Sequence, residues 1–531
     1  MHKNAIQKRT ENAPKNTQNN NDTNALLISG YGDAFLDIVC RDSVSGHEIR
    51  MMLALSLLDE LVCLEGRGSW LYYLSKQGYL RHIIESLASE DNNLNDLVNS
   101  RPVDHLKLLY VYETKMALLT RLASTATGSE MLLESGVLVK FAEMSVFSSR
   151  PEIGNFEREL QQSEELIPSA LSRYQQIIFP VLKLCQAILA ALGSENVSSA
   201  AQVLHFVTSH ECIVRVGLHY SNLFTLSGLQ ELSLLTGVIS RSVLTAENNP
   251  ENPDLHSHLS RIQRQMISLL AHFGSSEDLI KKIASGNLFH EENRDKALKS
   301  VLEIQANCLV YAVSTMGKGK NCRIILMPNL SEAIPDYNQD QAHHGGRSMS
   351  LGHLVLLIQH VMNRLSLTRA NLRDLKDKLK SVHHLSSKEM ASFLHESKLN
   401  KTSTPMDQRN LVQESIEKSI GNKQHELEIV VDSMENAAFV LWRHLDHFVN
   451  SNQSKNRLEF SDPVVKSRRS DQGFFGSYEA IERLKKETRS CFNDALFRKL
   501  DGIEATFEED KRGTFFSTIN RRLKRIATLY T

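Results

Sequence analysis

The chain has 531 residues, of which 41% are apolar and 23% are charged. Its 61 Lys and Arg residues against 62 Asp and Glu residues leave a formal net charge of -1, which excludes a globally basic nucleic-acid binder and a charge-driven disordered chain. With only 25 Gly and 11 Pro residues, many tight turns are unexpected, so an all-β sandwich or barrel is disfavoured.

Residues 1–28 are polar, rich in Asn and without the apolar stretch of a secretory signal, so we expect a disordered leader there. The seven cysteines include no C-x-x-C pair, which removes the usual signature of structural zinc and of a thioredoxin-type site, and a reducing compartment fits best. The most membrane-like stretch, 177–192, is shorter than the ~20 residues of a span and contains Pro180 and Lys183.

Residues 29–329 read as a succession of helical patterns, each closed by a short polar break, which is typical of stacked helix pairs. Capping boxes at 45–48 and 127–130 predict helix starts. Pro180 lies inside an apolar run and predicts a kink or a helix boundary.

A weak recurrence supports a repeated architecture. Three glycines each follow a helical pattern and precede a leucine by two residues, as expected where a left-handed glycine ends one helix and the leucine of the next is buried. These pairs are Gly78 and Leu80, Gly136 and Leu138, and Gly286 and Leu288. Chance is the alternative explanation, and the spacing is irregular, so the expected fold is all-α, beginning with a degenerate armadillo- or HEAT-like α-solenoid.

The pattern changes after a Pro- and Gly-containing linker at 330–350. Apolar residues step alternately by four and three over 354–382, and a second such seam follows over 427–448 in a long helix opened by Thr404 and Pro405. A capping box at 386–389 restarts the helix between them. We expect a long antiparallel helical hairpin over 351–450, a basic linker over 451–473 and C-terminal helices over 474–531.

No local pattern indicates an enzyme. The sequence has no phosphate-binding loop, dinucleotide fingerprint, H-E-x-x-H or G-x-S-x-G motif, so we expect no catalytic residues, no cofactor and no metal. The adjacent histidines at 343–344 and 383–384 have no suitably spaced carboxylate or thiolate and read as solvated. His444 and His447 read as packing or surface residues.

The C-terminal charge is the most suggestive polar feature. No acidic residue follows Lys511, Arg512 and the four cations of 521–525. Basic side chains in the last turn of a helix interact favourably with its macrodipole, so one interpretation is a solvated helix end. The alternative is a contact for an acidic partner, a phosphate-bearing polymer or an import receptor. Direct nucleic-acid binding is not expected, because no row of aromatic residues accompanies the charges. The candidate partner-binding residues are Trp442, at an edge of the predicted hairpin, and Arg521, Arg522, Lys524 and Arg525.

Several long strings resemble the large inner-ring scaffold nucleoporins of the nuclear pore complex, the two-hundred-and-five-kilodalton nucleoporin family. They begin with GYGDAFLDIVCRD at 30–42, and the resemblance covers nearly everything after residue 29. The other strings lie at 52–59, 70–80, 110–117, 180–189, 201–206 and 441–445.

This resemblance implies the C-terminal portion of a longer helical scaffold at the nuclear envelope, supporting pore assembly and nucleocytoplasmic transport. It implies binding of linker nucleoporins such as the ninety-three-kilodalton type, with no catalytic residues. The bulk of the family's N-terminal solenoid has no counterpart, so we expect a fragment or a partial product. A soluble α-solenoid transport receptor or adaptor is the alternative that the same fold allows.

Overall fold

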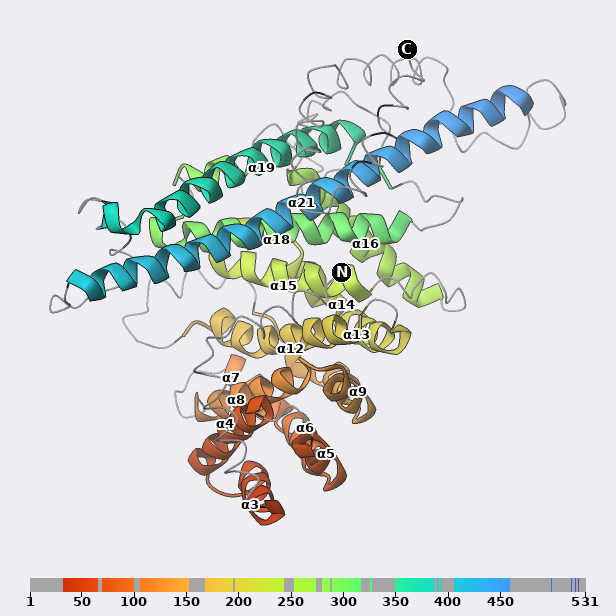
Figure 1. The fold of residues 1–531 in the computed structure, drawn as a ribbon. Coiled ribbons are helices and arrows are strands. Elements are labelled where there is room, and N and C mark those ends of the chain that lie inside the picture. The colour runs from red at the N-terminus through yellow and green to blue at the C-terminus, as the bar shows by residue number, and fades with distance from the viewer. Residues whose placement is uncertain are drawn as a thin grey trace. The chain divides into compact units, whose positions relative to one another are not determined.

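The computed structural model describes most of the chain between residues 32 and 458. The described residues are 32–64, 69–99, 106–151, 168–193, 196–242, 253–273, 279–286, 289–316, 325–326, 349–385, 389–390, 393, 405–458, 498, 517, 521 and 524. These residues form 17 α-helices and no strand (Figure 1), which confirms the predicted all-α class. The chain divides into two compact units, Met1–Gln263 and Arg264–Thr531, and the division falls within helix α16 (Pro253–Phe273).

The helices of the first unit form two rows. In one row α4, α8, α12 and α15 each contact the next, and in the other α6, α10, α13 and α14 do the same, while α3 contacts both α4 and α6 (Figure 1). Their bounds are α3 (Gly32–Val44), α4 (Glu48–Leu64), α5 (Ser69–Lys76), α6 (Tyr79–Ser89), α7 (Asp91–Asn99), α8 (Leu106–Leu122), α9 (Ala126–Glu134), α10 (Val137–Glu143), η2 (Ser145–Ser148), α12 (Ala170–Leu192), α13 (Val197–Ser209), α14 (Glu211–Gly217), η4 (Tyr220–Phe224) and α15 (Leu226–Ser242).

The recurring glycines have the conformation that the sequence predicts. Gly78, Gly136 and Gly286 have φ angles of 78°, 74° and 81°, in the left-handed region where glycine has no Cβ penalty. Leu80 and Leu138 are fully buried at the start of the following helix, whereas Leu288 lies outside the described residues. These turns let the chain reverse direction between neighbouring helices.

Both capping boxes predicted in this unit are wrong. Ser45 donates its hydroxyl proton to the carbonyl oxygen of Arg41 at 2.8 Å, so it closes α3, and α4 begins at Glu48. α9 begins at Ala126, and its N-cap is Thr125, whose Oγ1 accepts the N–H of Gly128 at 3.1 Å. In the first place the predicted cap hydroxyl bonds to the preceding helix, and in the second a threonine two residues earlier caps the helix.

α12 is longer than the apolar stretch read from the sequence and continues through Pro180, so no helix boundary lies there. One turn before the proline, the carbonyl oxygen of Ile177 accepts the buried hydroxyl of Tyr112 from α8 at 2.8 Å. By length and composition α12 could cross a membrane, and among the described helices it is the one that passes this test. It contacts α8 and α15, and half of its most apolar window is buried inside the protein.

In the second unit, the long helix α21 (Pro405–Leu458) contacts both α18 (Glu291–Met316) and α19 (Leu351–Lys380), as Figure 1 shows. The remaining elements are α17 (Leu279–Ala284) and η7 (Val382–His384). Arg364 of α19 contacts Glu426 of α21, whereas the later Leu372 belongs to a buried cluster with the earlier Val412 and Ile416. The two helices therefore run antiparallel where they touch.

Most of the residues of both seams are buried. On the first seam Leu354, Ile358, Val361, Leu365, Thr368, Leu372 and Val382 are buried, and on the second Val430, Met434, Ala438, Leu441 and Leu445 are buried. α21 continues to Leu458, past the predicted start of the basic linker, because 451–458 contains neither Gly nor Pro to stop it. The leader, 327–348, most of 386–389 and most of 459–531 lie outside the described residues.

Candidate partner-binding surfaces

Trp442 lies half-buried on α21, where neighbours on the same helix fix its ring. The ring of Phe439 meets it edge-on with centroids 5.6 Å apart, and the guanidinium carbon of Arg443 lies 5.7 Å from its centroid. A cation at that distance is attracted to the face of the indole. The structure thus presents a rigid, partly exposed indole, which is the kind of side chain that anchors partners.

The predicted C-terminal basic cluster is described at two positions. Arg521 is exposed and Lys524 is half-buried, and both have helical backbone. Arg522 and Arg525 lie outside the described residues, as do Lys511 and Arg512. A binding role for this cluster stays a prediction.

Two residues after Trp442, His444 is fully buried and makes three polar contacts. Its Nδ1 lies 2.8 Å from the carbonyl oxygen of Val440, and its Nε2 lies 3.2 and 3.3 Å from the backbone nitrogens of Ile325 and Leu326. Because the backbone N–H groups can only donate, Nε2 is the acceptor and Nδ1 carries the proton. Burial lowers the pKa of His444 to about 4, so the ring is neutral at pH 7.

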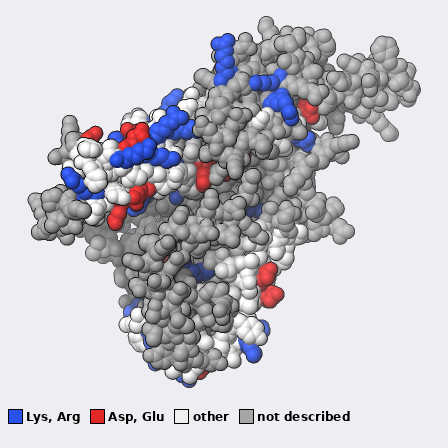
Figure 2. Space-filling view, in the orientation of Figure 1, with Lys and Arg blue, Asp and Glu red and all other residues white. Residues whose placement is uncertain are grey.

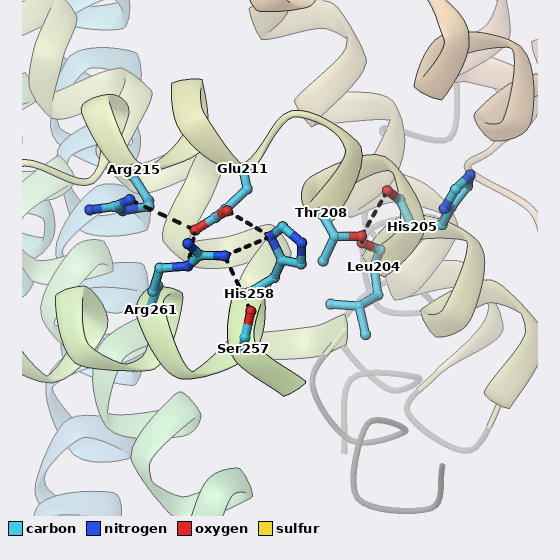
Figure 3. A network of polar contacts seen from close by, with 8 residues as sticks. All are labelled: Leu204, His205, Thr208, Glu211, Arg215, Ser257, His258 and Arg261. Atoms are coloured by element: carbon cyan, nitrogen blue, oxygen red, sulfur yellow. Dashed lines mark hydrogen bonds and ion pairs between the residues drawn. The ribbon is translucent and has the colours of Figure 1, made fainter. Parts of the chain in front are cut away.

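Figure 3 shows a network around Glu211, a buried carboxylate at the start of α14. Its Oε2 lies 2.6 Å from Nδ1 of His258, and its Oε1 lies 3.0 Å from Nε of Arg261, both on α16. Arg215 approaches the same carboxylate at 3.9 Å, and Arg261 also reaches the hydroxyl of Ser257 at 3.3 Å. This network ties the first part of α16 to α14.

A second carboxylate, Glu231 of α15, is paired with Arg150, two residues after the end of η2, and both side chains are almost completely buried. Gln175 of α12 donates to the other oxygen of Glu231 at 3.1 Å. A Cβ at Gly217 would lie 2.5 Å from the side chain of Leu235 and 3.0 Å from Glu231, so a larger residue there would require the Leu235 side chain to shift. The three helices α12, α14 and α15 thus meet around one buried ion pair.

The third network joins α19 to α21. Glu426 accepts hydrogen bonds from Arg364 at 2.7 Å, from Thr368 at 2.9 Å and from Lys423 at 2.7 Å. Burial by itself would raise the pKa of Glu426, but these three partners together hold it below its usual value. Sequence reasoning missed all three networks because no local spacing connects partners that are distant along the chain.

Exposed apolar side chains are the other candidate surfaces, and two groups stand out among the described residues. Ile49, Leu53 and Leu57 recur every four residues along α4. Val216, Tyr220 and Phe224 are exposed at the end of α14 and in η4. Neither group belongs to the residues singled out from the sequence, where both lie within the succession of helical patterns over 29–329.

The charged surface carries no dominant sign. In Figure 2 acidic and basic side chains lie side by side on the described part of the visible face, in keeping with the net charge of -1. Among the described residues no three His, Cys, Asp or Glu side chains gather as metal ligands. The described surface therefore offers apolar and aromatic groups, rather than a charged field, as its most distinctive contacts.

Comparison with known proteins gives one consistent result. Residues 4–243 match the family described as "Nuclear pore complex scaffold, nucleoporins 186/192/205". The human protein named nuclear pore complex protein Nup205 is 31% identical over 545 residues, which cover 94% of this chain and 27% of that protein. The Drosophila melanogaster protein of the same name is 27% identical over 515 residues, covering 94% of this chain and 24% of that protein.

A more distant relative is the Arabidopsis thaliana protein named NUP205, which is 21% identical over 236 residues, or 43% of this chain and 12% of that protein. The chain thus spans about a quarter of the length of the human and Drosophila relatives. The family match also begins at residue 4, earlier than the resemblance read from the sequence, which began at residue 30.

Proposed function

Because the chain belongs to the family of nuclear pore complex scaffold nucleoporins 186/192/205, we propose that it is a structural component of the inner ring of the pore, supporting pore assembly and nucleocytoplasmic transport. Its place is the nuclear pore complex, and its family is one of scaffolds, not of enzymes. The observation that carries the proposal is the 31% identity to human Nup205, sustained over 94% of the chain.

The fold proposed for residues 29–329 is an α-solenoid. Its support is the pair of helix rows in the first unit, in which α4, α8, α12 and α15 line up on one side and α6, α10, α13 and α14 on the other. Two such rows, with each helix touching the next, are what stacked helix pairs produce. The further division into a hairpin at 351–450, a basic linker at 451–473 and C-terminal helices at 474–531 is part of the same proposal.

The proposed partners are other nucleoporins, in particular a linker of the ninety-three-kilodalton type, bound as an amphipathic helix or short segment in a groove between helices. Trp442 is the proposed anchor, because an indole fixed by Phe439 and Arg443 loses little freedom on binding. Arg521, Arg522, Lys524 and Arg525 are proposed to contact acidic residues of the partner at the rim.

A fluorescent fusion at the nuclear rim tests the scaffold role. After bleaching, a scaffold recovers little over minutes, because its copies do not exchange, whereas a soluble transport receptor or adaptor recovers over seconds. Fast recovery would replace the proposal by the carrier alternative.

Binding of a purified linker-nucleoporin helix tests the partner claim. Trp442→Ala should weaken saturable binding by roughly 2 kcal/mol, the cost typical of a central aromatic anchor. The matched control is Tyr110→Ala on α8, since Tyr110 is an exposed aromatic residue with no proposed contact. Equal effects of the two substitutions would remove Trp442 from the binding surface, and absence of saturable binding would remove this partner.

A further inference from the structure

The apolar contact between α19 and α21 leaves the relative register of the two helices open. One apolar cluster joins residues of both helices: Leu372, Leu375 and Leu379 of α19 with Val412, Ile416 and Ile420 of α21. On α19, residues seven positions apart are alike, since Ile358 and the leucines 365, 372 and 379 follow one another at that interval. If α19 slides along α21 by seven residues, each of them is replaced by another aliphatic side chain. The apolar residues therefore determine which faces meet, but not which residues lie opposite one another.

The connections of α19 do not fix the register either. Among the described helices, α21 is the one against which α19 packs most extensively. α18 ends at Met316 and α19 begins at Leu351, and α19 ends at Lys380 while α21 begins at Pro405. A helical hairpin is typically closed by a loop of about 2–5 residues, which ties the two helix ends together. Both connections of α19 are several times longer, so chain length permits a slip of seven residues.

One polar cluster interrupts this apolar contact. Glu426 of α21 accepts hydrogen bonds from Arg364 and Thr368 of α19 at 2.7 and 2.9 Å, and its other oxygen accepts one from Lys423 at 2.7 Å. The side chains of Arg364 and Glu426 are 11% and 12% exposed, and Thr368 is 1% exposed. We call these four residues the Glu426 node. Two of its members come from each helix, so it exists only when the two helices are correctly aligned.

A slip of α19 by seven residues would separate Glu426 from its partners on α19 in either direction. In one direction the carboxylate would lie opposite Leu357 and Val361, which are both buried and apolar. In the other direction it would lie opposite Asn371 and Leu375. None of these four residues carries a positive charge, and a buried charge that loses its partner is strongly disfavoured.

Arg364 would lose its carboxylate in the same slip. It would lie opposite Ser419 in one direction and opposite Ser433 in the other. A single buried polar position fixes the register of many coiled coils in this way, because every other alignment leaves a polar group without a partner. We propose that the Glu426 node sets the register of α19 on α21, while the apolar residues hold the two helices together.

A distance between two spin labels in the full chain tests the proposal. The labels are attached to p-acetylphenylalanine at the exposed positions Asn363 of α19 and Glu414 of α21, so the native cysteines stay unchanged. Pulsed electron paramagnetic resonance should give one distance for the otherwise unchanged protein. Arg364→Met with Glu426→Met replaces the ion pair by apolar side chains of similar length. This variant should keep its helices and show a second distance, displaced by about 10 Å, since seven helical residues at ~1.5 Å each separate the alternative alignments.

The matched control removes another ion pair of α19. Asp377→Met with Lys380→Met replaces two exposed side chains and should leave the single original distance in place. A single original distance in the variant without Arg364 and Glu426 would overturn the proposal. Loss of the helical circular dichroism of that variant would overturn it too, because a pair that only sets the register is not required for folding.

Moving the carboxylate along α21 provides a second test, which has a direction. Glu426→Leu with Ser433→Glu places the carboxylate seven residues later in the chain. α19 should then shift until Arg364 meets position 433, and the distance between the labels at 363 and 414 should lengthen by about 10 Å, because the helices are antiparallel. An unchanged or shortened distance would show that Arg364 does not follow the carboxylate, and would contradict the proposed role of the node.

Discussion

The backbone N–H of Leu326 donates to Nε2 of His444, more than a hundred residues later in the chain, at 3.3 Å. The neighbouring N–H of Ile325 donates to the same nitrogen at 3.2 Å, and Leu326 is itself 2% exposed. A segment between α18 and α19 is thereby fixed to α21 by one neutral imidazole. Loss of that acceptor would leave the buried N–H of Leu326 without its partner, at about 1–3 kcal/mol, and would also remove the partner of the half-buried Ile325.

This relationship predicts a loss of stability in mild acid. The pKa of His444 is about 4 in the folded protein, because burial lowers it from 6.5, so the unfolded chain binds more protons between these values. The free energy of unfolding should therefore fall as the pH drops from 6.5 towards 4, with a contribution from His444 of about 2 kcal/mol between pH 7 and pH 5. Urea unfolding at the two pH values measures it.

His444→Phe provides the test of the assignment. It should lower stability at pH 7, because the N–H groups of Ile325 and Leu326 lose their acceptor, and it should remove the His444 part of the pH dependence. His384→Gln, at an exposed histidine of η7, should leave the pH dependence of the wild type in place. A pH dependence unchanged in His444→Phe would contradict the prediction.

A second prediction concerns the pairing of α19 with α21. Arg364 and Glu426 are each nearly nine-tenths buried, so Arg364→Ala or Glu426→Ala leaves a buried charge and should cost about 3 kcal/mol. The double substitution should cost less than the sum, with a coupling free energy of about 1–3 kcal/mol. Chemical unfolding of the four proteins gives this value.

The matched control uses another ion pair of α19. Lys380 and Asp377 lie 3.4 Å apart, but their side chains are 79% and 75% exposed, so their coupling should be below about 0.5 kcal/mol. Similar coupling in the two cycles would show that burial does not set the strength of the Arg364 and Glu426 contact.

A third prediction separates the cations around Glu211. Arg261 contacts the buried carboxylate at 3.0 Å, whereas Arg215 approaches only to 3.9 Å. Arg261→Ala should therefore speed hydrogen exchange at the start of α16, while Arg215→Ala, at a cation exposed to a similar degree, should change it little. If both substitutions accelerated hydrogen exchange equally, positive charge near Glu211, and not the specific contact of Arg261, would stabilise the start of α16.

Most of what could be predicted of the fold came from the apolar periodicity and from the positions of glycines. The step pattern placed Leu365 and Leu441 among buried residues, and Gly78 and Gly136 have the left-handed backbone inferred for them. Helix ends were less predictable, because a hydroxyl such as that of Ser45 can hydrogen-bond to any of several nearby backbone groups. Which group it bonds to depends on where the preceding helix ends, and the local sequence does not determine that position.

The candidate surfaces were harder to predict. Trp442 was singled out because it lies at an edge of the predicted hairpin, and it is half-buried in the structure. The exposure of Leu53 could not be predicted, because apolar periodicity alone does not show which face of a helix is left uncovered. The buried networks were invisible for a different reason. Glu231 meets Arg150 and Gln175 only because the residues that follow η2 and helix α12 both pack against α15.

The last prediction compares two glycines whose added Cβ would meet nothing within 4 Å. Gly136 has a φ of 74°, so Gly136→Ala forces alanine into the left-handed region and should lower the free energy of unfolding by about 1 kcal/mol. Gly421 lies inside α21 without a positive φ, so Gly421→Ala should raise it by about 0.4–1 kcal/mol through lower entropy of the unfolded chain. Opposite shifts of the thermal midpoint are expected, and a stabilising Gly136→Ala would show that the turn between α9 and α10 does not require the left-handed backbone.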